Sequence, residues 1–185
     1  MQIRNTLERY GLVSVILHWS MALAVLALFA LGYWMVGLNY FHEWYRQGPH
    51  IHRSVGVLLF IALIVRLIWR LANPRPRSLP NHQRWEVVTA HAVHWLFYGL
   101  LFVAMVSGYL ISTADGRSIH VFDWFQVPSI TGRQPGLEDT AGTVHEWSTW
   151  AIVALVAVHA AGALKHHLWD KDETLRRMLG LGRKR

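Results

Sequence analysis

The fold is decided by Val144-His-Glu-Trp-Ser-Thr-Trp-Ala-Ile-Val-Ala-Leu-Val-Ala-Val-His-Ala-Ala-Gly-Ala-Leu-Lys-His-His167, an apolar segment with histidines at positions 145 and 159. On a helix, a spacing of 14 residues puts both imidazoles on one face, about 21 Å apart along the axis. Ile152 and His166 continue the same line of sevens. The segment therefore predicts a long helix that presents histidines to its neighbours at two depths.

The composition places this helix in a membrane. The chain has 185 residues, of which 53% are hydrophobic and 16% are charged, whereas a soluble domain carries charge on about a quarter of its residues. Four apolar segments reach the roughly 20 residues that a membrane span requires, at about 12–38, 52–71, 91–112 and 145–168. We therefore predict an all-α integral membrane four-helix bundle that forms a single domain over residues 1–185.

The distribution of charge predicts the orientation of these helices. Most of the net charge of +7 comes from the linker between the second and third segments and from the tail after residue 168. The linker between the third and fourth segments holds two arginines against four acidic residues: Arg117, Arg133, Asp115, Asp123, Glu138 and Asp139. By the positive-inside rule, both termini and the middle linker face the cytoplasm. The basic residues are thus orientation signals, and we expect no nucleic-acid partner.

The absence of cysteine narrows the possible cofactors. It excludes disulfides, iron–sulfur clusters held by thiolates and covalent haem attachment through a C-x-x-C-H motif. Any haem in this chain is therefore of the b type, held by coordination and packing alone.

Ionisable residues inside a membrane are costly and are candidates for function. Given the orientation above, His52 and His145 lie at one depth near the periplasmic side, and His18 and His159 lie at a second depth nearer the cytoplasm. Four hydrogen-bonded core histidines are one explanation. Two b haems with two histidine ligands each are another, and we favour it over zinc, which takes four ligands at one point. Two axial histidines leave no open position on the iron, which points to electron transfer.

A second polar group is predicted at the cytoplasmic end. Arg66 and Arg70 are candidates for pairing with haem propionates, and His94 and His166 are candidates for binding and protonating a quinone. An ordinary basic rim at the lipid headgroups is the alternative. Small residues at Gly56 and Gly162 would let a flat macrocycle approach the helices.

Several loop segments carry weaker expectations. His42, His50, His82 and His120 are expected to be solvated or interfacial. Residues 121–127 are expected to form a short amphipathic piece on the membrane surface, and residues 170–180 a short cytoplasmic helix.

The order and spacing of many short motifs resemble the bacterial cytochrome b561 family over nearly the whole chain. They are His18-Trp19, His52-Arg-Ser-Val-Gly56, Val65-Arg-Leu-Ile-Trp-Arg-Leu71 with Pro74 and Pro76, His91-Ala-Val-His94, Ser107-Gly108, Val144-His-Glu-Trp147, His159-Ala-Ala-Gly-Ala-Leu-Lys-His-His167 and Asp172-Glu-Thr-Leu-Arg-Arg-Met178.

This resemblance implies a multi-pass cytochrome of the bacterial inner membrane with two b haems. It implies haem pairs His52/His145 and His18/His159 bound at the iron, a quinone near His94 and His166, and ubiquinone as the electron acceptor. Superoxide is the periplasmic donor that the family suggests. The linker between the third and fourth segments is net acidic, however, which favours a cationic or protein donor.

Two other functions remain open at this point. A membrane-anchor cytochrome b subunit would pass electrons from a partner dehydrogenase or hydrogenase to quinone. A proton or metal transporter would use an intramembrane histidine relay and hold no haem.

Overall fold

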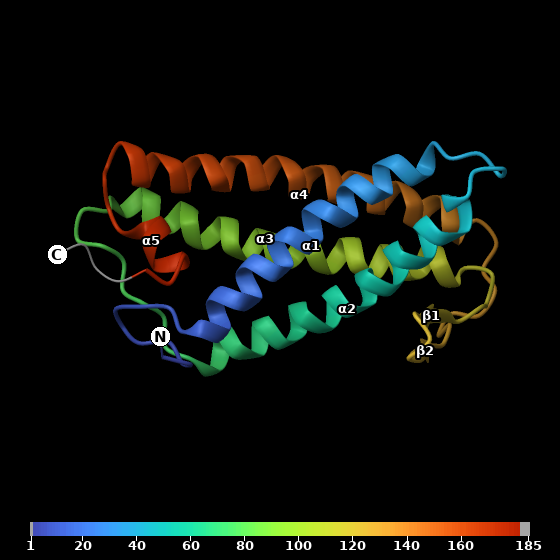
Figure 1. Ribbon diagram of the computed structural model, residues 1–185, viewed down its shortest axis with the longest axis horizontal. Helices are drawn as coiled ribbons and strands as arrows, with labels where there is room; N and C mark the ends of the chain where they lie inside the picture. Colours follow the sequence, from blue (N-terminus) through green and yellow to red (C-terminus); the bar gives the residue numbers. More distant parts are fainter. Residues whose placement is uncertain (1, 182–185) are drawn as a thin grey trace.

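Four long helices make up most of the computed structural model, which describes residues 2–181 (Figure 1). They are α1 (Leu12–Val36), α2 (Trp44–Ala72), α3 (Arg84–Thr113) and α4 (Leu137–Leu168). Each is long and apolar enough to cross a membrane. A short hairpin of β1 (Ile119–Val121) and β2 (Phe125–Val127) and a short helix α5 (Thr174–Met178) complete the described chain.

The long helices lie side by side and give the molecule two ends (Figure 1). Close packing joins α1 to α2, α2 to α3 and α3 to α4. The β-hairpin marks one end, which we call the hairpin end, and α5 marks the other, the α5 end. The first residues of the chain also lie at the α5 end, where the indole of Trp19 donates a hydrogen bond to the Met178 carbonyl over 2.8 Å.

Large side chains on the outside and small ones within are what a membrane bundle requires. Met21, Leu59 and Leu63 form a buried core cluster between α1 and α2, while side chains such as Leu23 remain 71% exposed on the outer surface. Buried positions also include small hydroxyl residues, among them Ser107 and Ser148. Small residues let helix backbones approach closely without the help of a hydrophobic effect.

Three of the long helices begin seven or eight residues earlier than the sequence predicts, at 44, 84 and 137 instead of 52, 91 and 145. Hydropathy detects only the apolar part of a helix that lies in lipid. Capping residues outside the apolar part allow the helix to begin earlier. At α3 the side chains of Gln83 and Glu86 form a reciprocal capping box. Gly136 precedes α4 in the left-handed region, at φ 79°. The first helix ends at Val36, two residues before its predicted end.

Residues 121–127, expected to form a short amphipathic piece on the membrane surface, belong to an antiparallel hairpin, in which Ile119 pairs with Val127 and Val121 with Phe125. The hairpin is anchored on α2 through Ser54, whose side chain is fully buried. The Ser54 hydroxyl accepts a hydrogen bond from the Phe122 backbone N–H over 2.9 Å. This long-range contact, which the local sequence does not encode, selects the hairpin.

Candidate functional site

The first histidine pair joins α2 to α4 near the hairpin end. The ring centroids of His52 and His145 lie 6.1 Å apart, with the rings inclined at 72°. The Nδ1 atom of His145 is 2.7 Å from the Ala104 carbonyl of α3, which leaves Nε2 free. The Nδ1 of His52 is buried and makes no hydrogen bond of acceptable geometry within residues 2–181, although the Leu28 carbonyl is close enough to interact with this imidazole.

The second pair joins α1 to α4 toward the α5 end. The ring centroids of His18 and His159 lie 6.2 Å apart, and the rings are inclined at 59°. A guanidinium nitrogen of Arg66, on α2, lies 2.9 Å from Nδ1 of His18. The structure thus brings together the histidines that were paired by their predicted depth in the membrane. It also adds Arg66 as a charged partner of His18.

The separation within each pair suits two axial ligands of one iron. With metal–nitrogen bonds of about 2.0–2.1 Å and ring nitrogens about 1.1 Å from the ring centre, two opposed imidazoles have centroids roughly 6.3 Å apart. The two observed separations, 6.1 and 6.2 Å, agree with this value. Edge-to-face ring contacts span about 4.5–7 Å as well, so the separation is compatible with ligation of a shared iron but does not require it.

Two glycines form part of the support around the hairpin-end pair. A Cβ added at Gly32 would lie 3.1 Å from Cε1 of His52, and one added at Gly108 would lie 3.1 Å from Cε1 of His145. Both glycines therefore let an imidazole lie directly against a helix backbone. At Gly56 and Gly162, which the sequence singles out, an added Cβ would meet no atom within 4 Å. The same holds for Gly99 and Gly142 in the long helices, so this open space is not particular to the two histidine pairs.

The other residues that the sequence predicts near the second pair, His18 and His159, lie beside it. The ring of His94 is 5.6 Å from that of His159. The Arg70 guanidinium stacks 5.6 Å from the ring centroids of Trp95 and of Tyr98, and its Nε is buried without a hydrogen-bond partner among residues 2–181. Arg66 and Arg70 are thus two partly buried cations next to the second pair, as an anionic group of a cofactor would require.

The comparison with known proteins identifies the family. A family model described as prokaryotic cytochrome b561 matches residues 9–181. The chain belongs to the prokaryotic cytochrome b561 family. It is therefore a multi-pass haem b protein of the bacterial inner membrane with a role in electron transfer. Family membership also removes the haem-free transporter as an explanation.

Curated relatives of this cytochrome match over almost their full length. It is 47% identical over 180 residues to cytochrome b561 homolog 2 of Escherichia coli (strain K12), which covers 97% of the chain and 96% of that protein. It is 27% identical over 174 residues to a probable superoxide oxidase CybB of Yersinia pestis, covering 93% and 96%. It is 25% identical over 182 residues to cytochrome b561 homolog 1 of Escherichia coli (strain K12), covering 94% and 98%.

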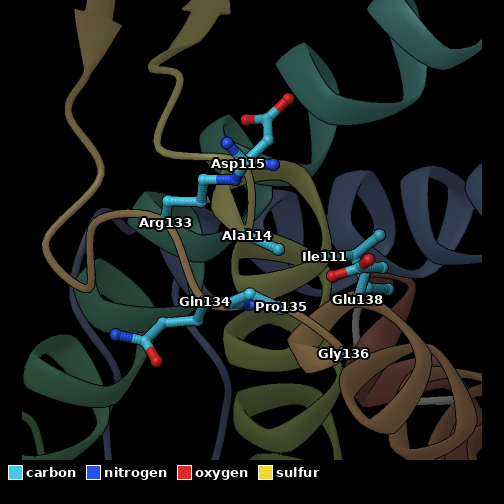
Figure 2. Close-up of a pocket in the computed structure, with 8 residues that line it drawn as sticks. All are labelled: Ile111, Ala114, Asp115, Arg133, Gln134, Pro135, Gly136 and Glu138. Atoms are coloured by element: carbon cyan, nitrogen blue, oxygen red, sulfur yellow. The ribbon is translucent and has the colours of Figure 1, made fainter.

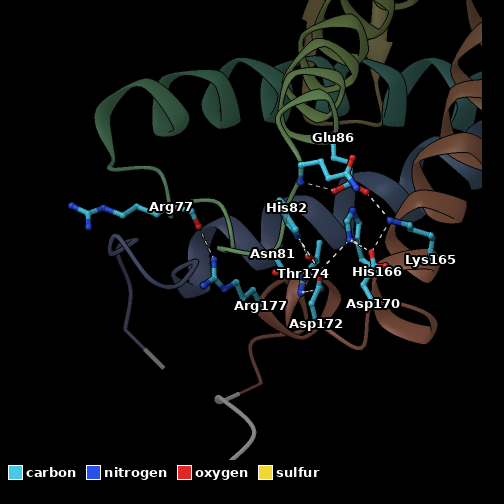
Figure 3. A network of polar contacts seen from close by, with 11 residues as sticks. Arg77, Asn81, His82, Glu86, Lys165, His166, Asp170, Asp172, Thr174 and Arg177 are labelled. Carbon is cyan, nitrogen blue, oxygen red and sulfur yellow. Dashed lines mark hydrogen bonds and ion pairs between the residues drawn. The ribbon is translucent and has the colours of Figure 1, made fainter.

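His166 lies in a polar cluster at the α5 end of the cytochrome (Figure 3). We call it the α5-end cluster, and it consists of Asn81, His82, Glu86, Lys165, His166, Asp170, Asp172 and Thr174. His82, expected to be solvated or interfacial, has a side chain that is only 14% exposed here and lies 3.0 Å from a carboxylate oxygen of Asp172. No spacing signal could have revealed this contact, because 90 residues separate its partners.

The electrostatics of the α5-end cluster favour an ionised Asp172. Burial acts to raise the pKa of this carboxyl group, but hydrogen bonds from Thr174 and His82 and the nearby His166 outweigh it. The pKa of Asp172 therefore lies below its usual value, and the group carries its charge at neutral pH although only 5% of its side chain is exposed.

A shallow hollow of about 370 Å³ lies at the hairpin end, where the chain leaves α3 and enters α4 (Figure 2). Its charged lining residues are Asp115, Arg133 and Glu138. Asp115 also forms an ion pair with Arg117. The hollow therefore presents both signs of charge at the end of the molecule next to the His52/His145 pair.

Proposed function

We propose that this cytochrome holds two b haems and carries electrons through the membrane from a donor at the hairpin end to ubiquinone at the α5 end. The observation that carries the proposal is the separation of the two histidine pairs, 6.1 and 6.2 Å between ring centroids, which suits two ligands on opposite sides of an iron. His52 and His145 would hold one haem, and His18 and His159 the other.

The chain's own residues would orient and charge-balance these groups. The two histidines of each pair would hold one haem, which when bound would supply one-electron chemistry. The Ala104 carbonyl, 2.7 Å from Nδ1 of His145, can accept a hydrogen bond from the Nδ1–H group, which would keep the lone pair on Nε2 for an iron shared with His52. Arg66 and Arg70 supply positive charge at the second pair, where propionate carboxylates would be bound.

The acceptor site is proposed at the α5 end. Reduction of a quinone to a quinol consumes two electrons and two protons, so a quinone site needs titratable donors near the last haem. His94, with its ring 5.6 Å from that of His159, is placed to supply one proton. His166 follows on the same helix as His159 and reaches the α5-end cluster, which leads toward the surface. We assign this end to the cytoplasm because the basic linker and tail lie there.

Haem loading of histidine variants tests the proposal. His145→Ala and His159→Ala should each lose about half of the b haem, measured as pyridine haemochrome per purified chain, because each removes one of two ligands from one iron. His120→Ala is the matched control, since the side chain of this histidine on β1 is exposed to solvent. Full haem content in both variants would overturn the ligand assignment.

The identity of the electron donor distinguishes two candidate functions, a superoxide oxidase and a membrane-anchor subunit. One relative is named as a probable superoxide oxidase, which supports superoxide as donor. The hairpin-end linker is net acidic, which repels a small anion and favours a cationic protein donor, as for a membrane-anchor subunit. Quinone reduction driven by superoxide, measured on the purified cytochrome alone, distinguishes them: a rate above the uncatalysed reaction supports the oxidase, and no increase together with a co-purifying dehydrogenase supports the anchor.

A further inference from the structure

Three metal-binding side chains converge within the α5-end cluster, outside both histidine pairs. They come from three separate segments: His82 from the linker between α2 and α3, His166 from the last turn of α4, and Asp172 from the linker before α5. One ligand atom of each lies within 4.8 Å of the other two. Nε2 of His82 is 3.0 Å, and Nδ1 of His166 is 3.1 Å, from the same carboxylate oxygen of Asp172.

These separations approach those of a tetrahedral zinc site. With metal–ligand bonds of about 2.0–2.1 Å, the edge of the coordination tetrahedron measures roughly 3.3 Å. Two of the three ligand pairs thus already stand within a few tenths of an ångström of that spacing. Two imidazoles and one carboxylate form a donor set that catalytic and regulatory zinc sites use, with a fourth position left for another ligand.

The hydrogen bonding of His166 is incomplete in a way that a cation would complete. Its Nδ1 atom is buried and lies 2.8 Å from an oxygen of Asp170 and 3.1 Å from one of Asp172. Nevertheless it makes no hydrogen bond of acceptable geometry within the described residues. We therefore regard these approaches as electrostatic contacts rather than hydrogen bonds. A nitrogen placed beside carboxylates but not directed at either one is suited to bind a shared cation.

A second possible ligand set consists of Glu86, His166 and Asp170. The negative charge of its carboxylates is already partly balanced by Lys165. The Lys165 ammonium lies 2.6 Å from Glu86 and 2.8 Å from Asp170, and so occupies the space between these carboxylates. Within residues 2–181, His82, His166 and Asp172 have no such internal ammonium group between them. An added cation would therefore stabilise this set more than the other. All three side chains are at most 16% exposed, so their charges are only weakly screened by solvent.

We propose that His82, His166 and Asp172 bind a divalent transition metal ion, with Zn²⁺ as the ion that this donor set suits best. Its fourth ligand is a water molecule or the Thr174 hydroxyl, which lies 3.3 Å from Nε2 of His82. The bound ion ties the linker 73–83 to the end of α4 and to the segment before α5. This inference is independent of the two proposed haem sites, because none of its three ligands belongs to a histidine pair, but it shares His166 with the proposed quinone site.

Zinc titration of the haem-loaded full-length protein, purified in detergent without a histidine tag, tests the inference. Calorimetry should show one Zn²⁺ per chain and an increase in thermal stability. His82→Ala and Asp172→Asn should each weaken binding by more than roughly 100-fold, because even second-shell changes cost 10–100-fold. His82→Cys, which supplies another zinc ligand, should restore binding. The control His120→Ala should bind as wild type does.

The haem spectrum separates this inference from the proposed function. It should be the same in all four variants, so that a loss of zinc binding is not mistaken for a loss of fold. The inference is overturned if wild type binds no stoichiometric Zn²⁺, or if His82→Ala and Asp172→Asn bind it as tightly as wild type. The α5-end cluster would then be a hydrogen-bonded network without a metal.

Discussion

The imidazole of His18 is constrained by a charged neighbour. Arginine only donates hydrogen bonds, so the contact of 2.9 Å makes Nδ1 of His18 an acceptor and leaves the proton on Nε2. Ligation through Nε2 requires its lone pair. If His18 binds haem as proposed, Arg66 would have to release this imidazole, and a propionate would be a suitable new partner for the guanidinium. A positive charge that stays near this haem stabilises its reduced form.

Replacing Arg66 therefore tests whether its positive charge raises the midpoint potential of the haem proposed at His18 and His159. Arg66→Met should lower one of the two midpoint potentials by on the order of 50–100 mV, as expected for a unit charge about 10 Å from the iron at an effective dielectric constant of about 20. Potentiometric titration of the purified protein measures it. Arg75→Met, at an exposed position of the linker, should leave both potentials unchanged. Equal potentials in Arg66→Met and wild type would refute the assignment.

Gly108 tests the close approach of an imidazole to α3. Gly108→Ala should push His145 aside, because the new Cβ would lie 3.1 Å from Cε1 and 3.2 Å from Nδ1 of that ring. We expect a lower haem content and a shifted spectrum of the hairpin-end haem. Gly99→Ala on the same helix meets no atom within 4 Å. It should keep both haems and gain about 0.5–1 kcal/mol of helix stability. If both variants bind haem equally, Gly108 does not position His145.

At the scale of elements, the hairpin depends on one buried hydroxyl of α2. Ser54→Ala removes the acceptor for the Phe122 N–H and the donor to the His120 carbonyl. Leaving such groups unpaired costs about 1–3 kcal/mol. Hydrogen exchange in residues 117–127 should therefore accelerate while the long helices stay protected. Ser20→Ala, which loses only a bond to Ile16 within α1, should leave the hairpin unchanged. Unaltered exchange in Ser54→Ala would show that other contacts anchor it.

The elements also show what the sequence can and cannot predict. Four apolar spans are visible because lipid imposes length and hydropathy, and the depths of four histidines follow from counting along those spans. The early start of α4 depends on the local conformation of Gly136, and the hairpin depends on a contact between residues 68 apart. His82 and Gly108 likewise acquire their roles from lateral contacts between segments. Periodicity carries no information about such contacts, so these residues are found only in the structure.

The whole molecule has one basic and one acidic end, which predicts its orientation. The basic linker 73–83 and α5 lie at one end, and the hairpin with its acidic surroundings lies at the other (Figure 1). Because cationic segments are retained on the cytoplasmic side, the hairpin end should face the periplasm. In this orientation the proposed donor would reach the His52/His145 pair from outside the cell, and the proposed quinone reduction would take up protons near the cytoplasm.

The absence of native cysteine makes this orientation directly measurable. Gln126→Cys, exposed on β2, should react with a membrane-impermeant maleimide added to intact cells whose outer membrane has been permeabilised. Ser78→Cys, equally exposed in the linker at the opposite end, should react only after the inner membrane is also opened. The haem spectrum of each variant serves as the control for folding. The reverse pattern would invert the direction of electron flow proposed above, because the hairpin end would then meet cytoplasmic donors.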